Sequence, residues 1–115
     1  MANTFKVITK ANVTSADVIY TVAGSTTTII LGLMLGNTTS GSSNATVTLG
    51  TDTASRAGDG TEANQDVELL TTTAIPGNTT LELLAGNKVV MEATDTLSVT
   101  GSAALDVVLS VMEIT

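Results

Sequence analysis

Short runs of apolar and β-branched residues, separated by Gly, Asn, Ser and Asp, recur along the whole chain. Turn residues at roughly ten-residue spacing between such runs are typical of an antiparallel sandwich. The expected strands cover residues 5–9, 17–22, 26–35, 45–49, 67–71, 80–84, 88–92, 96–100 and 106–114. Helical periodicity with a cap is absent. We therefore predict one all-β domain over residues 1–115, an antiparallel β-sandwich or jelly-roll-like fold of eight or nine short strands with little helix.

The longest apolar stretch, residues 26–35, predicts a central strand that is buried on both faces over part of its length. Residues 37–44 are almost all turn formers, and we expect them to close a hairpin to the strand at 45–49. Gly-Asn-Thr-Thr occurs at 36–39 and again at 77–80. A duplicated hairpin would explain the repeat, but coincidence is favoured in a chain so rich in threonine.

The core is expected to be aliphatic because the chain has one Tyr, one Phe and no Trp. Both aromatics, Phe5 and Tyr20, are expected in the core. The remaining expected core positions are the inward-facing aliphatic residues of the strands: Val18, Ile30, Leu33, Leu35, Val47, Leu49, Leu69, Leu81, Leu83, Val90, Leu97, Val99, Val107, Leu109 and Val111.

Composition argues against catalysis. The sequence contains no Cys and no His, whereas 23 of its residues are threonines. Enzymes at neutral pH draw mainly on His, Cys, paired carboxylates and metals. We therefore predict no catalytic residues, no cofactor and no enzymatic activity, and interpret the chain as a structural protein.

The net charge of −7 excludes two classes of partner. Nucleic acids and anionic membranes both require clustered Lys and Arg, and the chain has only four basic residues. The first residues lack the apolar segment of a secretory signal, and the most apolar run is far shorter than the ~20 residues of a membrane helix. We expect a soluble protein that binds neither nucleic acid nor membrane.

Residues 51–64 form the longest predicted loop, which carries Arg56, the single Arg of the chain. Its acidic residues and the neighbouring strand start offer oxygen ligands of the kind that Ca²⁺ requires: Asp52, Asp59, Glu62 and Asp66. Their spacing is not that of an EF-hand loop, so we interpret the segment as a solvated acidic loop and predict no metal site.

Several segments resemble small virion structural proteins of tailed phages that infect marine bacteria or cyanobacteria. They are residues 1–6, 20–22, 30–33, 36–39 and 111–115. The resemblance implies a head decoration (cement) protein, assembled in the host cytoplasm, whose partners are the major capsid protein or other virion proteins. A tail, neck or fibre component, including a host-surface binding module, is the alternative.

An aliphatic core with two aromatics and an apolar terminal strand also predicts a homo-oligomer, with a trimer favoured. Contacts with other subunits or the shell are expected from residues 51–64, because loops at the ends of a sandwich are free. They are also expected from residues 2–9, because Lys6 and Lys10 bring two of the four basic charges there and a terminal strand can pair with the edge of a neighbour's sheet. The expected contact residues are Phe5, Lys6, Lys10, Arg56, Asp59 and Glu62.

Overall fold

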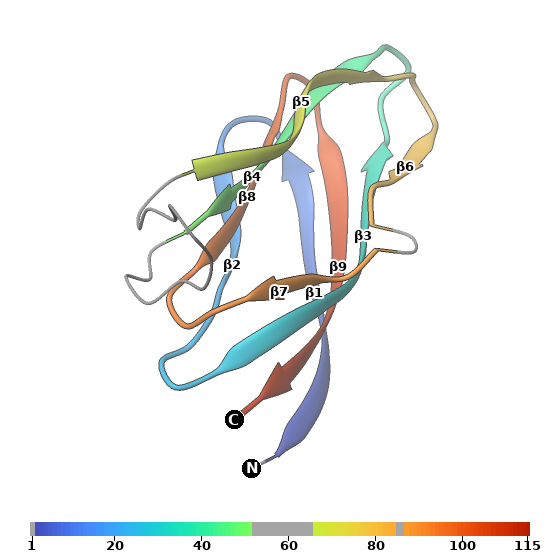
Figure 1. Ribbon diagram of the computed structural model, residues 1–115. Helices are drawn as coiled ribbons and strands as arrows, with labels where there is room; N and C mark the ends of the chain where they lie inside the picture. Colours follow the sequence, from blue (N-terminus) through green and yellow to red (C-terminus); the bar gives the residue numbers. More distant parts are fainter. Residues whose placement is uncertain (1, 52–65, 85–86) are drawn as a thin grey trace.

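The computed structural model describes residues 2–51, 66–84 and 87–115, and these residues form nine strands and no helix (Figure 1). The all-β prediction is confirmed. The strands are β1 (Asn3–Val13), β2 (Asp17–Thr21), β3 (Thr27–Asn37), β4 (Ser43–Gly50), β5 (Asp66–Ile75), β6 (Thr80–Glu82), β7 (Val89–Met91), β8 (Thr96–Gly101) and β9 (Leu105–Ile114).

The strands make two antiparallel sheets. Sheet A has the order β1-β9-β3-β6, with β7 also paired to β3, and sheet B has the order β2-β8-β4-β5. The pairs β4–β5, β3–β6, β2–β8 and β1–β9 are nested in the sequence, so the chain is one long antiparallel ribbon rolled into two layers. This is the jelly-roll arrangement.

The two termini lie side by side at the open end of the ribbon (Figure 1). Ala2 and Thr115 exchange backbone hydrogen bonds, with N···O distances of 3.2 and 3.0 Å. The first and last segments of the sequence are therefore neighbours along nearly the full length of β1 and β9.

The core lies between the inner faces of the two sheets. Most expected core positions are buried there or pack against it, Tyr20 included. The prediction was wrong at Phe5, Val18 and Val90, which are exposed. It also missed buried residues near strand ends and in turns: Val13, Val22, Ala45, Ile75, Leu84, Met91 and Leu105.

A bulge explains the error at Val18. The β2–β8 register shifts between Val18 and Tyr20, so the two side chains point to opposite faces although they are two residues apart. Val90 sits in a strand of three residues, too short for alternation to show which face is buried. Phe5 pairs with Met112 on the outer face of sheet A, while the next residue, Lys6, pairs with buried Val111.

The expected hairpin after β3 is also wrong. β3 is central in sheet A, as predicted, but β4 belongs to sheet B, so residues 38–42 carry the chain from one layer to the other. Buried Asn37 holds this crossing: its Nδ2 donates to the carbonyls of Gly41 and Ile75, both at 2.8 Å. Its Oδ1 accepts from the backbone N of Thr39 at 2.9 Å and from the Thr39 hydroxyl at 2.7 Å.

The two Gly-Asn-Thr-Thr segments meet at this crossing. The N–H of Asn37 donates to the carbonyl of Thr79 at 2.8 Å, and the N–H of Asn78 donates to the carbonyl of Thr39 at 3.0 Å. Backbone here approaches backbone so closely that a Cβ at Gly77 would lie 2.3 Å from the Ser40 carbonyl oxygen. Gly77 is therefore required, because there is no room for a side chain at this position.

Candidate assembly surface

The outer face of sheet A is apolar across four strands. Phe5 pairs with Met112, Met112 with Ile29 and Ile29 with Val90, so these side chains form one row on the outer face of the sheet. Phe5 is 71% exposed and Val90 is 58% exposed. Neighbouring rows add further apolar side chains. We call this surface the apolar face, defined by Phe5, Val7, Ile29, Met34, Val90 and Met112.

The outer face of sheet B has a different composition. Its corresponding row runs Val18, Ser98, Thr48 and Glu68, and the next row pairs Thr46 with Thr100. A sheet with one face in water normally carries polar side chains on that face, as sheet B does. The apolar face of sheet A differs from this pattern, and contiguous exposed apolar surface is typical of sites that contact a protein, a membrane or a ligand.

A hollow of about 200 Å³ interrupts the apolar face. It lies where Gly32 pairs with Ser110, and a Cβ built on Gly32 would meet no atom within 4 Å. The adjoining row, Val108, Met34 and Glu82, forms its other side. The missing side chain of Gly32 therefore opens a recess beside the exposed row that contains Phe5.

Three of the predicted contact residues, Phe5, Lys6 and Lys10, lie on β1, which is an edge of sheet A. Phe5 points outward into the apolar face. Lys6 and Lys10 face the opposite way and make ion pairs within the chain, to Glu113 at 2.8 Å and to Asp17 at 3.6 Å. The other three, Arg56, Asp59 and Glu62, lie outside the described residues.

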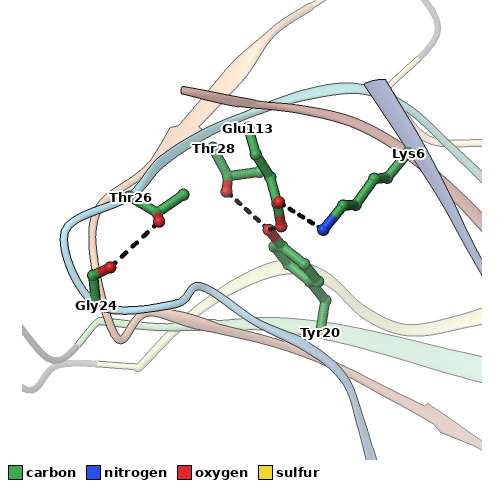
Figure 2. Close-up of polar contacts among 6 residues, drawn as sticks. All are labelled: Lys6, Tyr20, Gly24, Thr26, Thr28 and Glu113. Carbon is green, nitrogen blue, oxygen red and sulfur yellow. Dashed lines mark hydrogen bonds and ion pairs between the residues drawn. The ribbon is translucent and has the colours of Figure 1, made fainter. Parts of the chain in front are cut away.

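A polar network on the inner side of sheet A ties the two layers together near the termini (Figure 2). The Tyr20 hydroxyl on β2 donates to Oε2 of Glu113 on β9 at 2.5 Å. The same hydroxyl lies 2.8 Å from Oγ1 of Thr28 on β3, and since its proton points to Glu113 it accepts from Thr28. Lys6 completes the network through its ion pair with Glu113.

The network favours one protonation state. Burial, and then the hydrogen bond to the Glu113 carboxylate, raise the pKa of Tyr20 to about 12. The hydrogen bonds from Lys6 and then from Tyr20 hold the pKa of Glu113 below its usual value. The neutral phenol and the charged carboxylate therefore stabilise each other's protonation state. We call Lys6, Tyr20, Thr28 and Glu113 the clasp, because they link the two sheets.

Tyr20 gives this clasp a direct optical readout because it is the single Tyr of a chain without Trp. We expect tyrosinate absorbance of the folded protein to appear with a midpoint near pH 12, against about 10 in denaturant. The unfolded state ionises first, so the stability due to this group is intact below pH ~10 and is lost as the pH rises to ~12. Circular dichroism of the same samples reports the folded fraction.

A matched pair of variants checks the cause. Glu113→Gln should lower the midpoint only in part, because burial remains, and Glu82→Gln on the outer face of β6 should leave it unchanged. Equal midpoints in folded and denatured wild-type protein would contradict the assignment.

The described residues contain no group of three or more Asp, Glu, His or Cys residues that could hold a metal ion. Of the four acidic residues weighed as Ca²⁺ ligands, only Asp66 is described, at the start of β5. Within residues 2–51, 66–84 and 87–115, no helix is long and apolar enough to cross a membrane.

Sequence reasoning named Phe5 both as a core residue and as a contact residue, and it named no other residue of the apolar face as a contact. The available signal was the apolar character of both faces of two strands: residues 29–35 and 107–109 are continuous apolar runs apart from glycine. Such runs indicate strands covered on both sides. In this chain they belong to a two-layer fold in which only the inner side is covered by the protein itself.

Comparison with known proteins supports the fold. No family model matches the chain, and none of the curated proteins matches it. Among solved structures, it is similar to a protein described under the heading "Bacillus endospore appendages form a novel family of disulfide-linked pili", with a TM-score of 0.50 and 15% identity over 97% of this chain and 84% of the other. At that identity the likeness is one of fold, and the present sequence contains no cysteine for a disulfide.

Proposed function

We propose that this protein is a non-enzymatic structural subunit of a larger protein assembly, and that it docks through the apolar face of sheet A. The observation that carries the proposal is the contrast between the two outer faces, one apolar and one rich in hydroxyl groups. A role in chemistry finds no support in the residue types present, and the solved structure of similar fold belongs to pili, which are also assemblies of protein subunits.

Within this class, we propose capsid decoration of a tailed phage, on the strength of the sequence resemblance at the two ends of the chain and at residues 20–22, 30–33 and 36–39. Mass spectrometry of purified particles tests this assignment. A copy number close to that of the major capsid protein supports decoration. A small copy number per particle, equal to the number of subunits in one ring, supports the tail or neck instead.

The docking face can be tested with two valines of nearly equal exposure. Val90 in the apolar face is 58% exposed, and Val18 on the outer face of sheet B is 56% exposed. Both Val90→Lys and Val18→Lys should fold, because surface substitutions usually change stability by less than ~0.5 kcal/mol. We expect Val90→Lys to reduce occupancy in the assembly at least ~10-fold, since it buries a charge in an apolar contact.

Val18→Lys should retain wild-type occupancy. Quantitative mass spectrometry of assemblies reconstituted with each purified variant gives the comparison. Equal occupancy for both variants would show that the apolar face is not the docking surface.

A further inference from the structure

The apolar face carries both a projection and a recess. Phe5 projects from β1 with most of its side chain exposed, and the hollow at Gly32 lies two strands away in the adjoining row. We infer that the apolar face binds the same face of a second copy of this chain, with Phe5 of each copy seated in the other's hollow. This inference rests on the proposed function, and it names the partner.

Size favours Phe5 as the group that fills the recess. An apolar cavity of about 150 Å³ accommodates benzene. The hollow, at about 200 Å³, is large enough for a phenyl ring, and it is lined by Val108, Met34 and Leu33 together with Ser110 and Glu82. In a twofold contact, residue i of one copy meets residue j of the other and the reverse. A single geometry therefore fills both hollows and covers both phenylalanines.

The charges of the face also suit a second copy. The row from Phe5 to Val90 and the row of Val7, Ser110 and Gly32 contain no charged side chain, and Glu82 lies at the far side of the hollow. A chain with a net charge of −7 repels its copies at long range, and a contact centred on these uncharged rows brings one carboxylate per copy near the interface. Salt screens the repulsion, so we expect self-association to strengthen as ionic strength rises. Docking onto a basic partner would weaken instead.

The area of the face places the contact among small interfaces. Four strands spaced ~4.8 Å apart, with ~3.4 Å per residue along β9, give a face of roughly 500 Å². Two copies then bury roughly 1,000 Å², which is at the lower end for a specific interface. The pair should therefore be weak in solution and gain strength where many copies are held in one assembly. The twofold pair differs from the trimer expected from composition.

Sedimentation velocity over a concentration series up to about 1 mM tests the inference, because a contact of this size has a dissociation constant in the micromolar to millimolar range. Phe5→Ser removes the projection and should raise the dissociation constant at least ~10-fold. Gly32→Val fills the recess and should do the same. The added Cβ meets no atom within 4 Å, so this variant should melt at or above the wild-type temperature. Val18→Lys, on the other sheet, should associate like wild type.

The outcomes separate this inference from the proposed function. A wild-type chain that remains monomeric up to about 1 mM at both low and high salt overturns the second-copy inference. So does association that Phe5→Ser and Gly32→Val leave unchanged. The proposed function would be contradicted only if Val90→Lys had the same occupancy in assemblies as the wild-type chain. A monomeric chain whose occupancy still depends on Val90 would mean that the apolar face docks on a different protein.

Discussion

Replacing Asn37 by Asp should destabilise the fold by about 2–4 kcal/mol, although the two side chains have nearly the same shape. Asn37 is buried, and its Nδ2 donates to the carbonyls of Gly41 and Ile75. Asp has no donor at that position, so two carbonyls would face a carboxylate oxygen, and a buried charge would replace a neutral amide. The crossing between the sheets would lose the contacts that hold it together.

Asn44 provides the control, because Asn44→Asp makes the same chemical change at an exposed position on the outer face of sheet B. Urea denaturation followed by circular dichroism gives both free energies of unfolding. We expect a change below ~0.5 kcal/mol for Asn44→Asp. If the two variants lost the same stability, the added charge alone would explain the loss, and the role assigned to the Asn37 amide would be wrong.

The sequence predicted the strands well because each is a short apolar run between turn formers, a property that a single segment carries by itself. The pairing of strands could not be obtained in the same way. Residues 37–44 have the composition of a hairpin loop, and nothing local distinguishes a turn within one sheet from a crossing between two. The difference depends on Asn37 reaching Ile75, which is 38 positions away.

Face assignment failed where the strand departs from strict alternation. The bulge in β2 turns Val18 outward while Tyr20 remains inside. Side chains along a strand alternate between its two faces, so one extra residue exchanges the expected inward and outward positions beyond it. For the candidate surface, the charge pattern of the N-terminal segment drew attention to Lys6 and Lys10. Both lysines are engaged within the chain, and the exposed feature of the same strand is Phe5.

The apolar face is assembled from distant parts of the sequence. Its central row takes one residue each from β1, β9, β3 and β7, so it exists only after the nested ribbon has rolled into two layers. The clasp joins Lys6, Glu113 and Thr28 on the inner side of β1, β9 and β3 to Tyr20 on β2 of the other sheet. Folding and docking should therefore be coupled, because an incompletely rolled chain presents no contact surface.

Replacing Gly77 by Ala should cost about 1–3 kcal/mol, since a methyl group there would force backbone apart. Its Cβ would lie 2.3 Å from the Ser40 carbonyl oxygen, 2.5 Å from the Ser40 carbonyl carbon and 2.9 Å from the Thr39 carbonyl oxygen. These are main-chain atoms, and the hydrogen bonds between Asn37, Thr79, Thr39 and Asn78 limit how far they can move.

Gly41→Ala is the matched change on the other side of the same crossing, where a Cβ would meet nothing within 4 Å. Thermal unfolding of the two variants should show a clear loss for Gly77→Ala and little change for Gly41→Ala. Equal melting temperatures would mean that the two Gly-Asn-Thr-Thr segments can separate without loss, and that their close approach does not stabilise the fold. A loss confined to Gly77→Ala would instead show that the second copy of this motif requires its glycine for the contact that joins the two layers.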